Sequence, residues 1–590
     1  MVVNIALTPP RNLFAWDCFG YHLYLSATVI HDDPFIHDLA WVEEARLKND
    51  AAGTLYMVTS LEDGTRVIKC AIGLAVSWTP WFFMGHGLAW LTGAPMDGYT
   101  WPYQVCVAAG VLVYLLLGLL ALRAVLVRYF ADGTAALALV FVTIGTNLIV
   151  QVNTDLTMPH LTLFAIQCGV LYHTMHWYEL RRWKNAIALG VLIGMAALIR
   201  PTEVIVVLLP MLWGIAGNFF GHVRSVFKNL LQWATIGALI FLVGSIQLLY
   251  WKGATGHWMV DPYTNPAEGL DFNSPHTMNF LFSYRKGWLL YTPMMLFALL
   301  GLFWLHRHFR AAATGVIALL LLYVYVTSSW TNWWYADSFS ARPMVALYGV
   351  LSLALAALIT ELKAHKPWLR WPVFVGMIAC VLFNLFQRWQ FEHGLIHISR
   401  MTEKAYWAVF GQTEKPVDFE DLLMIARTNN GNQPTPDLSR YRKAELRADY
   451  KQRIPSDLDT TIIYPDGSER TVYRLGPQAL WTPTVRIPYE ELTNKDHAWI
   501  AAEWYVCLPS TATRLTCSHS FEFQKRNYGA QGFDAADMDV EPGRWDTIRT
   551  MYLTPEVRTT KDLLRMFFWL KDTSHVLVDG PVVTVYEPLW

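Results

Sequence analysis

Ten long apolar segments recur along the first two thirds of the chain, and they constrain its fold more than any other feature. They lie at about 103–126, 134–151, 160–177, 185–199, 203–218, 229–250, 288–305, 311–328, 343–360 and 371–388. Several reach the length of about 20 residues that lets an apolar helix cross a bilayer. Only 16% of the residues are charged, whereas soluble globular chains have about 25%. The sequence therefore predicts a polytopic α-helical membrane domain with about ten spans.

The basic residues between these segments form two unequal sets, which predicts an orientation. Alternate loops hold about twelve of them, namely Arg123, Arg128, Arg181, Arg182, Lys184, Arg224, Lys228, Arg307, Arg310, Lys363, Lys366 and Arg370. The other loops hold five, namely Arg200, Lys252, Arg285, Lys286 and Arg342. Because Lys and Arg are enriched in cytoplasmic loops, we expect the first set in the cytoplasm.

This orientation has two requirements near the N-terminus. The apolar run at 70–92 must not cross the membrane, and its Pro80 and glycines favour a helix that lies along the outer interface. Residues 17–102 then form a long first external loop, although residues 1–16 resemble neither a span nor a signal peptide. We therefore expect a first helix upstream of Met1 that this sequence does not contain.

The chain changes character after about residue 390. We assign residues 1–410 to the membrane domain and the polar, Pro- and Gly-broken residues 411–458 to a linker. Short β-rich runs separated by turns fill residues 459–590, which predicts an all-β domain of the sandwich or jelly-roll type outside the cytoplasm. Cys507 and Cys517 could form a disulfide there, or they could remain separate thiols.

Several familiar functions are excluded. The net charge of −1 at pH 7 gives no overall field that would favour nucleic acid. The chain has no P-loop, no G-x-G-x-x-G after a strand, no H-E-x-x-H and no G-x-S-x-G. A function must therefore be sought among the polar residues of the external segments.

The first such residues flank the beginning of the membrane domain. In FAWDCFGYHLYL, Asp17 either caps a helix at the outer surface or acts as a general base toward an acceptor hydroxyl. In NTDLTMPHLTLF, Asp155 and His160 either bind a metal ion together with Asp17, orient a substrate, or begin a helix. In LIRPTE, Arg200 and Glu203 either pair to hold a helical hairpin or serve a function, since ionisable groups at membrane depth are costly.

Two later segments add cations and aromatic rings. In FSYRKGWLLYTP, Arg285 and Lys286 oppose the positive-inside bias, so they either bind a phosphate or extend to lipid headgroups. The segment SSWTNWWYADSFSARP could be an interfacial aromatic belt or a carbohydrate site. Its residues of interest are Trp333, Trp334, Tyr335, Asp337 and Arg342.

The ordered set AWDCFGYHLYL, TDLTMPH, LIRPTE, SYRKGWLLYTP and WWYADSFSARP resembles the GT-C-type membrane glycosyltransferases, close to the bacterial protein-mannosyltransferase-like (PMT-like) group. The resemblance covers about residues 14–410. It implies a polyprenyl-phosphate sugar donor and a catalytic acidic residue after the first helix, here Asp17. It also implies interfacial helices in the first external loop. The chain departs from the family in having a single Asp17 where an Asp/Glu pair is usual, and in lacking the first helix.

The chemistry expected from the resemblance is a single displacement. We expect Arg285, Lys286 and Arg342, or a divalent metal ion, to stabilise the charge that develops on the leaving phosphate. Asp17 would deprotonate the acceptor hydroxyl on the opposite side of the sugar C1, which inverts that carbon. The residues expected to contact substrate are Asp155, His160, Arg200, Trp333, Trp334, Tyr335 and Asp337. The expected location is the bacterial inner membrane, with the C-terminal domain in the periplasm.

Two other functions remain open. A transporter or flippase of a lipid-linked sugar would need outer cations and aromatic rings too, but it should carry polar residues deep in its spans or symmetric broken helices. Only Arg200 and Glu203 approach that pattern. A non-catalytic glycan-binding membrane protein would depend on the C-terminal domain alone and would leave the apolar segments unexplained.

Overall fold

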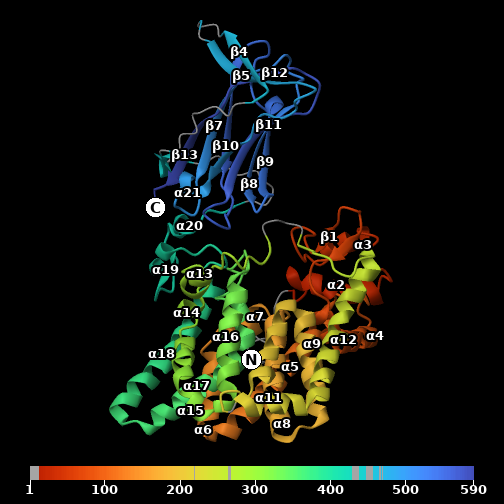
Figure 1. Ribbon diagram of the computed structural model, residues 1–590, viewed down its shortest axis with the longest axis vertical. Helices are drawn as coiled ribbons and strands as arrows, with labels where there is room; N and C mark the ends of the chain where they lie inside the picture. Colours follow the sequence, from red (N-terminus) through yellow and green to blue (C-terminus); the bar gives the residue numbers. More distant parts are fainter. Residues whose placement is uncertain are drawn as a thin grey trace. The chain divides into compact units, whose positions relative to one another are not determined.

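The computed structural model describes residues 12–217, 219–263, 268–427, 437–444, 446, 456–463, 467 and 469–589. The chain forms two compact units (Figure 1). The helical unit comprises Met1–Thr264 and Gly269–Leu423, and the β unit comprises Met424–Trp590 with Asn265–Glu268. Residues 1–11, where the N-terminal expectations fall, lie outside the described residues, as does much of the predicted linker.

The segment predicted to form the first external loop folds into short elements. They are α2 (Asp17–Val29), α3 (Ala40–Lys48), the antiparallel hairpin of β1 (Val58–Ser60) and β2 (Arg66–Ile68), and α4 (Gly73–Thr92). Helix α4 lies directly against the following helix, because a Cβ atom added at Gly85 would be 2.7 Å from the Cα atom of Tyr103. The run predicted at 70–92 is thus helical, and it is not one of the helices long and apolar enough to span a bilayer.

Five described helices are long and apolar enough to cross a membrane. They are α5 (Trp101–Tyr129), α12 (Leu230–Thr255), α16 (Arg310–Ser328), the continuous pair η2 (Arg342–Leu347) and α17 (Tyr348–Ala364), and α18 (Pro367–Glu392). Helices α6 (Asp132–Ile144) and α7 (Leu148–Thr154), bent by 46°, would together make a sixth. The polytopic helical character is therefore as expected for a multi-pass membrane protein.

The other predicted segments are also helical, but they do not meet the same criteria. They are α8 (Pro159–Leu180), α9 (Trp183–Ile199), η1 (Pro201–Val207) with α10 (Leu208–Leu212), and α14 (Trp288–Tyr291) with α15 (Met294–His308). Helix α9, with 17 residues, is short, and α8 carries polar side chains such as Gln167 and His173. The predicted count of ten spans is therefore not confirmed.

Close helix packing depends on small residues, as is common in membrane bundles. A Cβ atom at Gly301 of α15 would lie only 2.0 Å from the carbonyl oxygen of Ala354 in α17. A Cβ atom at Gly118 of α5 would lie 2.7 Å from the Cα atom of Ala165 in α8. Glycine is thus required where these backbones cross. The remaining helices of the unit are α11 (Phe219–Lys228), α13 (Thr277–Phe282), α19 (Glu403–Val409) and α20 (Phe419–Leu422).

The loops with many basic residues meet at one end of the helical unit. Arg128 pairs with Glu179 at 3.1 Å, which joins the ends of α5 and α8. Arg307 pairs with Glu361 at 3.1 Å, which joins α15 to α17. The rings of Tyr129 and Phe309 stack at 3.7 Å and connect these two groups of loops. The loops that are rich in basic residues therefore lie together at one end of the folded unit.

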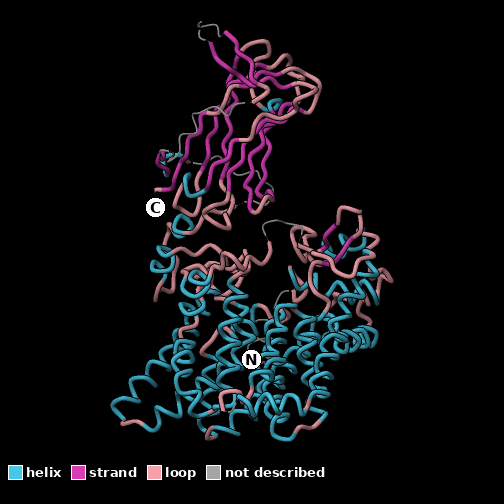
Figure 2. The backbone as a smooth tube through the Cα atoms, viewed as in Figure 1, coloured by secondary structure: helices cyan, strands magenta, loops and turns pink. Residues whose placement is uncertain are grey.

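The β unit contains two antiparallel sheets that share one core (Figure 2). The seven-stranded sheet has the order β3-β13-β7-β12-β5-β4, with β10 also paired to β7, and the four-stranded sheet has the order β6-β11-β8-β9. Trp504 of β7 meets Phe568 of β11 edge-on at 5.1 Å, which places one residue of each sheet in the shared core. The β-rich character predicted for this region is confirmed.

The strands of the β unit are short and begin earlier than predicted. They are β3 (Tyr441–Ala444), β4 (Asp459–Ile463), β5 (Glu469–Leu475), β6 (Val485–Pro488), β7 (Trp499–Cys507), β8 (Leu515–Phe523), β9 (Arg526–Asp534), β10 (Trp545–Leu553), β11 (Leu563–Leu570), β12 (Val576–Val578) and β13 (Val582–Pro588). Short helical turns lie at η3 (Leu438–Arg440), α21 (Tyr489–Leu492) and η4 (Ala535–Asp537). Strand β3 thus lies inside the segment predicted as a linker.

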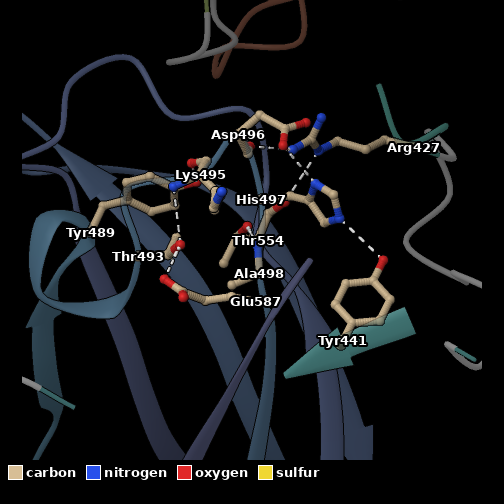
Figure 3. Close-up of polar contacts among 10 residues, drawn as sticks. All are labelled: Arg427, Tyr441, Tyr489, Thr493, Lys495, Asp496, His497, Ala498, Thr554 and Glu587. Carbon is tan, nitrogen blue, oxygen red and sulfur yellow. Dashed lines mark hydrogen bonds and ion pairs between the residues drawn. The ribbon is translucent and has the colours of Figure 1, made fainter. Parts of the chain in front are cut away.

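A polar network attaches the early part of the β unit to its central strands (Figure 3). Arg427 donates to the carbonyl oxygens of Thr554 and Asp496 at 3.2 and 3.0 Å. His497 contacts the Asp496 carboxylate at 3.0 Å through Nδ1 and the Tyr441 hydroxyl at 3.1 Å through Nε2. These contacts explain how residues outside the predicted β region come to belong to the β unit.

The two cysteines that could have formed a disulfide are both free. Cys507 ends β7 in the seven-stranded sheet, whereas Cys517 is buried in β8 of the four-stranded sheet. The Sγ atom of Cys517 lies 3.4 Å from Nε2 of His519 instead. Of the two alternatives that the sequence left open, the structure therefore has the separate thiols.

Candidate functional site

Asp17 is the first residue of α2 and lies at the centre of the candidate site. Trp16, with φ of 54°, turns the chain into the helix, so the Asp17 carboxylate lies at the positive end of the helix dipole. The Tyr56 hydroxyl donates to Oδ1 at 2.8 Å, and Nη2 of Arg342 lies 3.6 Å from Oδ2. The Asp17 side chain is nevertheless 37% exposed. It is therefore both oriented by the protein and reachable by a substrate.

Arg342 begins η2 and uses little of its hydrogen-bonding capacity. Its side chain is 11% exposed, and its Nε is buried without a hydrogen-bond partner. Within the described residues its one ion pair is the contact with Asp17. A guanidinium carries five N–H donors in a planar fork. Arg342 therefore keeps donors available for an anion.

Arg200, between α9 and η1, is a second cation of this kind. No hydrogen bond or ion pair engages its guanidinium in the part of the chain that the structure describes. It lies within electrostatic reach of Glu203, Tyr323 and Tyr335. Arg200 and Glu203 therefore act on each other electrostatically, but among the described residues no direct hydrogen bond joins their side chains.

Buried Glu203 connects the segments that carry the two cations. Its carboxylate accepts hydrogen bonds from the Tyr323 hydroxyl at 2.7 Å and from Nε2 of Gln167 at 2.9 Å. The same hydroxyl is 3.0 Å from the carbonyl oxygen of Pro343, the residue after Arg342. The network thus fixes the position of η1, after Arg200, relative to η2.

Asp155 and His160 lie beside these cations. Asp155 follows α7 and accepts a hydrogen bond from Nε2 of Gln151 at 3.1 Å. Burial raises the pKa of Asp155, while Arg342 and Lys286 act in the opposite direction. His160 is fully buried in α8, and neither ring nitrogen has a hydrogen-bond partner among the described residues. Arg200 and Arg342 both act on His160 electrostatically, so both predicted residues lie in the same neighbourhood as Asp17.

Arg285 and Lys286 are already occupied by protein groups. The Lys286 ammonium, on a residue only 2% exposed, donates to the carbonyl oxygens of Ser338 and Ile398. Burial lowers the pKa of Lys286, and Arg285 lowers it further. Nε of Arg285 donates to the carbonyl oxygen of Ser399 at 2.7 Å. These contacts favour a structural role for both residues, in which they fasten the loop before α14 to the segment at 398–399.

The aromatic residues of the predicted sugar platform are largely covered. Trp333 is buried, and the Arg285 guanidinium lies 3.9 Å from the centre of the Trp334 ring. Tyr335 donates from its hydroxyl to the carbonyl oxygen of Thr327 at 2.8 Å. Asp337 is exposed and acts electrostatically on Lys286. Arg200 and Arg342 both act on Tyr335 electrostatically, so this residue lies beside the two cations.

The sequence left open a metal site formed by Asp155 and His160 together with Asp17. Among the described residues, no three His, Cys, Asp or Glu side chains are grouped so that they could hold a metal ion. Asp17, Asp155 and His160 therefore do not form a ligand set together.

The sequence did not reveal two important partners in this neighbourhood. Tyr56 orients Asp17 from a loop between α3 and β1. Tyr323 binds Glu203 from the interior of α16. Neither residue has a characteristic spacing from the residue it contacts, so no local pattern could have identified it. No protein-family model matches the chain, and no curated protein matches it.

Proposed function

We propose that the chain is a membrane glycosyltransferase of the GT-C type, which transfers a sugar from a polyprenyl-phosphate donor to an acceptor hydroxyl. One observation carries the proposal: a reachable carboxylate, Asp17, lies beside the guanidinium of Arg342, whose donors the protein leaves largely unused. A general base and fixed cations for a leaving phosphate are the two groups that this reaction needs.

The proposed reaction is a single displacement. Asp17 accepts the proton of the acceptor hydroxyl, and the acceptor oxygen attacks C1 of the sugar. The bond between C1 and the phosphate oxygen breaks, and its electron pair leaves with the polyprenyl phosphate. Arg342, with Arg200 nearby, stabilises the charge on that phosphate through N–H donors that match its oxygens. The configuration at C1 is inverted.

The candidate spans support a lipid-linked donor. A polyprenyl chain partitions into the bilayer, so its phosphate is confined to the membrane surface, where an enzyme with several spans can reach it. We place the site on the periplasmic face of the bacterial inner membrane, because Arg200 and Arg342 belong to the loops with few basic residues. The β unit would lie on the same side.

The test is a turnover assay on the purified full-length protein, reconstituted in lipid nanodiscs. A panel of polyprenyl-phosphate sugars with radiolabelled sugar would be incubated with glycan, lipid and peptide acceptors. We expect release of free polyprenyl phosphate and appearance of label in one acceptor class. Movement of an intact labelled donor across a vesicle bilayer, without cleavage of the sugar–phosphate bond, would instead support the flippase alternative.

A further inference from the structure

Helix α11 (Phe219–Lys228) stands apart from the rest of the helical unit, because none of its residues is buried. Its largest side chains are apolar and open to the surroundings: Phe219, Phe220 and Phe227 are 57%, 82% and 70% exposed. A short helix that exposes three phenylalanines to water would be unfavourable, since each buries a large apolar area when it is covered. Something outside the chain is therefore expected to cover this face.

The opposite face of α11 is fixed to the protein. Nη2 of Arg181 donates to Oγ of Ser225 at 2.7 Å, and the same guanidinium lies 4.2 Å from the ring centre of Trp177. The ring of His222 stacks near that of Tyr178 with centroids 6.3 Å apart. Because side chains three residues apart share a helix face, these contacts hold the side of Ser225 and His222 inward. Phe220 and Phe227, on the opposite side of the helix and the most exposed of the three, consequently point away from the protein.

Two cations border the apolar stripe. Arg224 and Lys228 are four residues apart, so they lie on one face of α11, and both are exposed. Neither forms an ion pair in the described ranges of the chain. Helix α11 thus has an inward polar face, an outward apolar face and a basic edge between them, which is the pattern of a helix lying in a membrane interface.

The apolar stripe continues onto a candidate span. Leu230 and Leu231, at the beginning of α12, are 59% and 69% exposed, and α12 is one of the helices able to cross a bilayer. Helix α11 lies at the same end of the helical unit as the α8–α9 turn, through the Arg181–Ser225 contact (Figure 1). That position coincides with the boundary where lipid headgroups would meet the span.

We propose that α11 is an interfacial helix, with its phenylalanines inserted below the headgroups and Arg224 and Lys228 bound to the phosphates of anionic phospholipids. The occupant of the exposed face is thus the bilayer itself. The charge complementarity and the continuity with α12 favour lipid over a protein partner. The inference depends on the membrane location of the helices and not on the glycosyltransferase proposal.

The first test is photo-crosslinking in the full-length protein. p-Benzoylphenylalanine would replace Phe220, and the protein would be irradiated in vesicles of phosphatidylcholine and phosphatidylglycerol at a ratio of about 7:3. We expect a phospholipid adduct on the α11 peptide in mass spectra. The same probe in place of Tyr178 should instead crosslink within the chain. A protein adduct at position 220 in native membranes, or no lipid adduct in vesicles, would overturn the proposal.

The second test concerns the charge of the lipid. The ratio of phosphatidylglycerol to phosphatidylcholine retained by the purified protein would be measured by native mass spectrometry. A basic residue near an anionic surface contributes about 1 kcal/mol, or roughly fivefold in affinity. The double variant Arg224→Gln/Lys228→Gln should therefore reduce phosphatidylglycerol affinity by about 25-fold, and Arg486→Gln/Arg526→Gln in the β unit should not. If wild type and both double variants retain the same ratio of phosphatidylglycerol to phosphatidylcholine, Arg224 and Lys228 do not bind anionic lipid.

Discussion

The Asp17 carboxylate and the Arg342 guanidinium lie 3.6 Å apart, which joins the first turn of α2 to the beginning of η2. In the proposed reaction the Asp17 carboxylate accepts the proton of the acceptor hydroxyl, and the Arg342 guanidinium binds the donor phosphate. A phosphate that binds Arg342 would compete with Asp17 for the same donors. Binding of the donor would thereby release the carboxylate for proton transfer.

Asp17→Asn should abolish transfer and leave folding and donor binding nearly unchanged. The amide cannot accept the acceptor proton, and loss of a general base costs about 10²–10⁴-fold in rate. Turnover of a labelled polyprenyl-phosphate sugar would be compared with that of wild type and of Glu62→Gln, a change at an exposed residue between α2 and α4. Near-normal turnover by a folded Asp17→Asn protein would leave this residue as a helix cap.

Arg342→Lys should weaken donor binding by about 1.5–3 kcal/mol, the range for hydrogen bonds to charged groups. The ammonium keeps the charge but loses the planar fork that matches a phosphate. Arg307→Lys is the matched control, since Arg307 pairs with Glu361 among the basic loops at one end of the unit. Binding of a polyprenyl-phosphate sugar would be titrated for all three proteins. If their affinities are equal, Arg342 does not contact the donor.

Lys286→Met should act on stability and not on donor affinity. The substitution leaves the carbonyl oxygens of Ser338 and Ile398 without their donor, at a cost of about 2 kcal/mol or more. Thermal unfolding and donor titration would be measured on the same preparations. Lys404→Met, at an exposed position, should change neither quantity. A loss of donor affinity with unchanged stability would return Lys286 to the phosphate site expected from the sequence.

The sequence predicted the helical segments well because an apolar stretch must avoid water wherever it folds. It could not predict the number of spans, since a segment such as α8 combines helical length with polar residues that face other helices. Hydropathy measures composition, whereas the buried position of Gln167 beside Glu203 is a tertiary property.

The residues of the candidate site could be selected from the sequence because charged residues are rare near the apolar segments. Asp17, Arg200 and Arg342 attract attention because ionisable residues are costly near apolar segments. The same argument also selected Arg285 and Lys286, whose partners are backbone carbonyls of distant segments. No spacing in the sequence distinguishes a cation that is free to bind phosphate from one that is held by the protein.

Stability of the β unit should fall as the pH decreases from about 6.5 toward 3. Burial lowers the pKa of His519 to about 3, whereas an unfolded histidine takes up a proton near pH 6.5. Below pH 6.5 the unfolded chain binds more protons than the folded chain, so the free energy of unfolding decreases by up to about 1.4 kcal/mol per pH unit.

The measurement is thermal unfolding of the full-length protein between pH 7 and 4, followed by tryptophan fluorescence. His519→Gln should show a smaller decrease in Tm over this range, because its side chain does not titrate. It should also be less stable at pH 7, since Thr550 loses a contact of 3.1 Å with the imidazole. If Tm depends on pH in the same way in wild type and His519→Gln, the decrease is not due to His519.

The helix that begins with Arg342 differs from the other candidate spans in its surroundings. In η2–α17, 94% of the most apolar stretch is buried inside the protein, against 17% in α12 and 17% in α18. Helices exposed to lipid tilt when the bilayer becomes thicker or thinner. A helix surrounded by protein has little contact with lipid, so a change in bilayer thickness does not act on it directly. The position of Arg342 relative to Asp17 is therefore set by side-chain packing. The peripheral helices can therefore follow the thickness of the membrane while the site keeps its geometry.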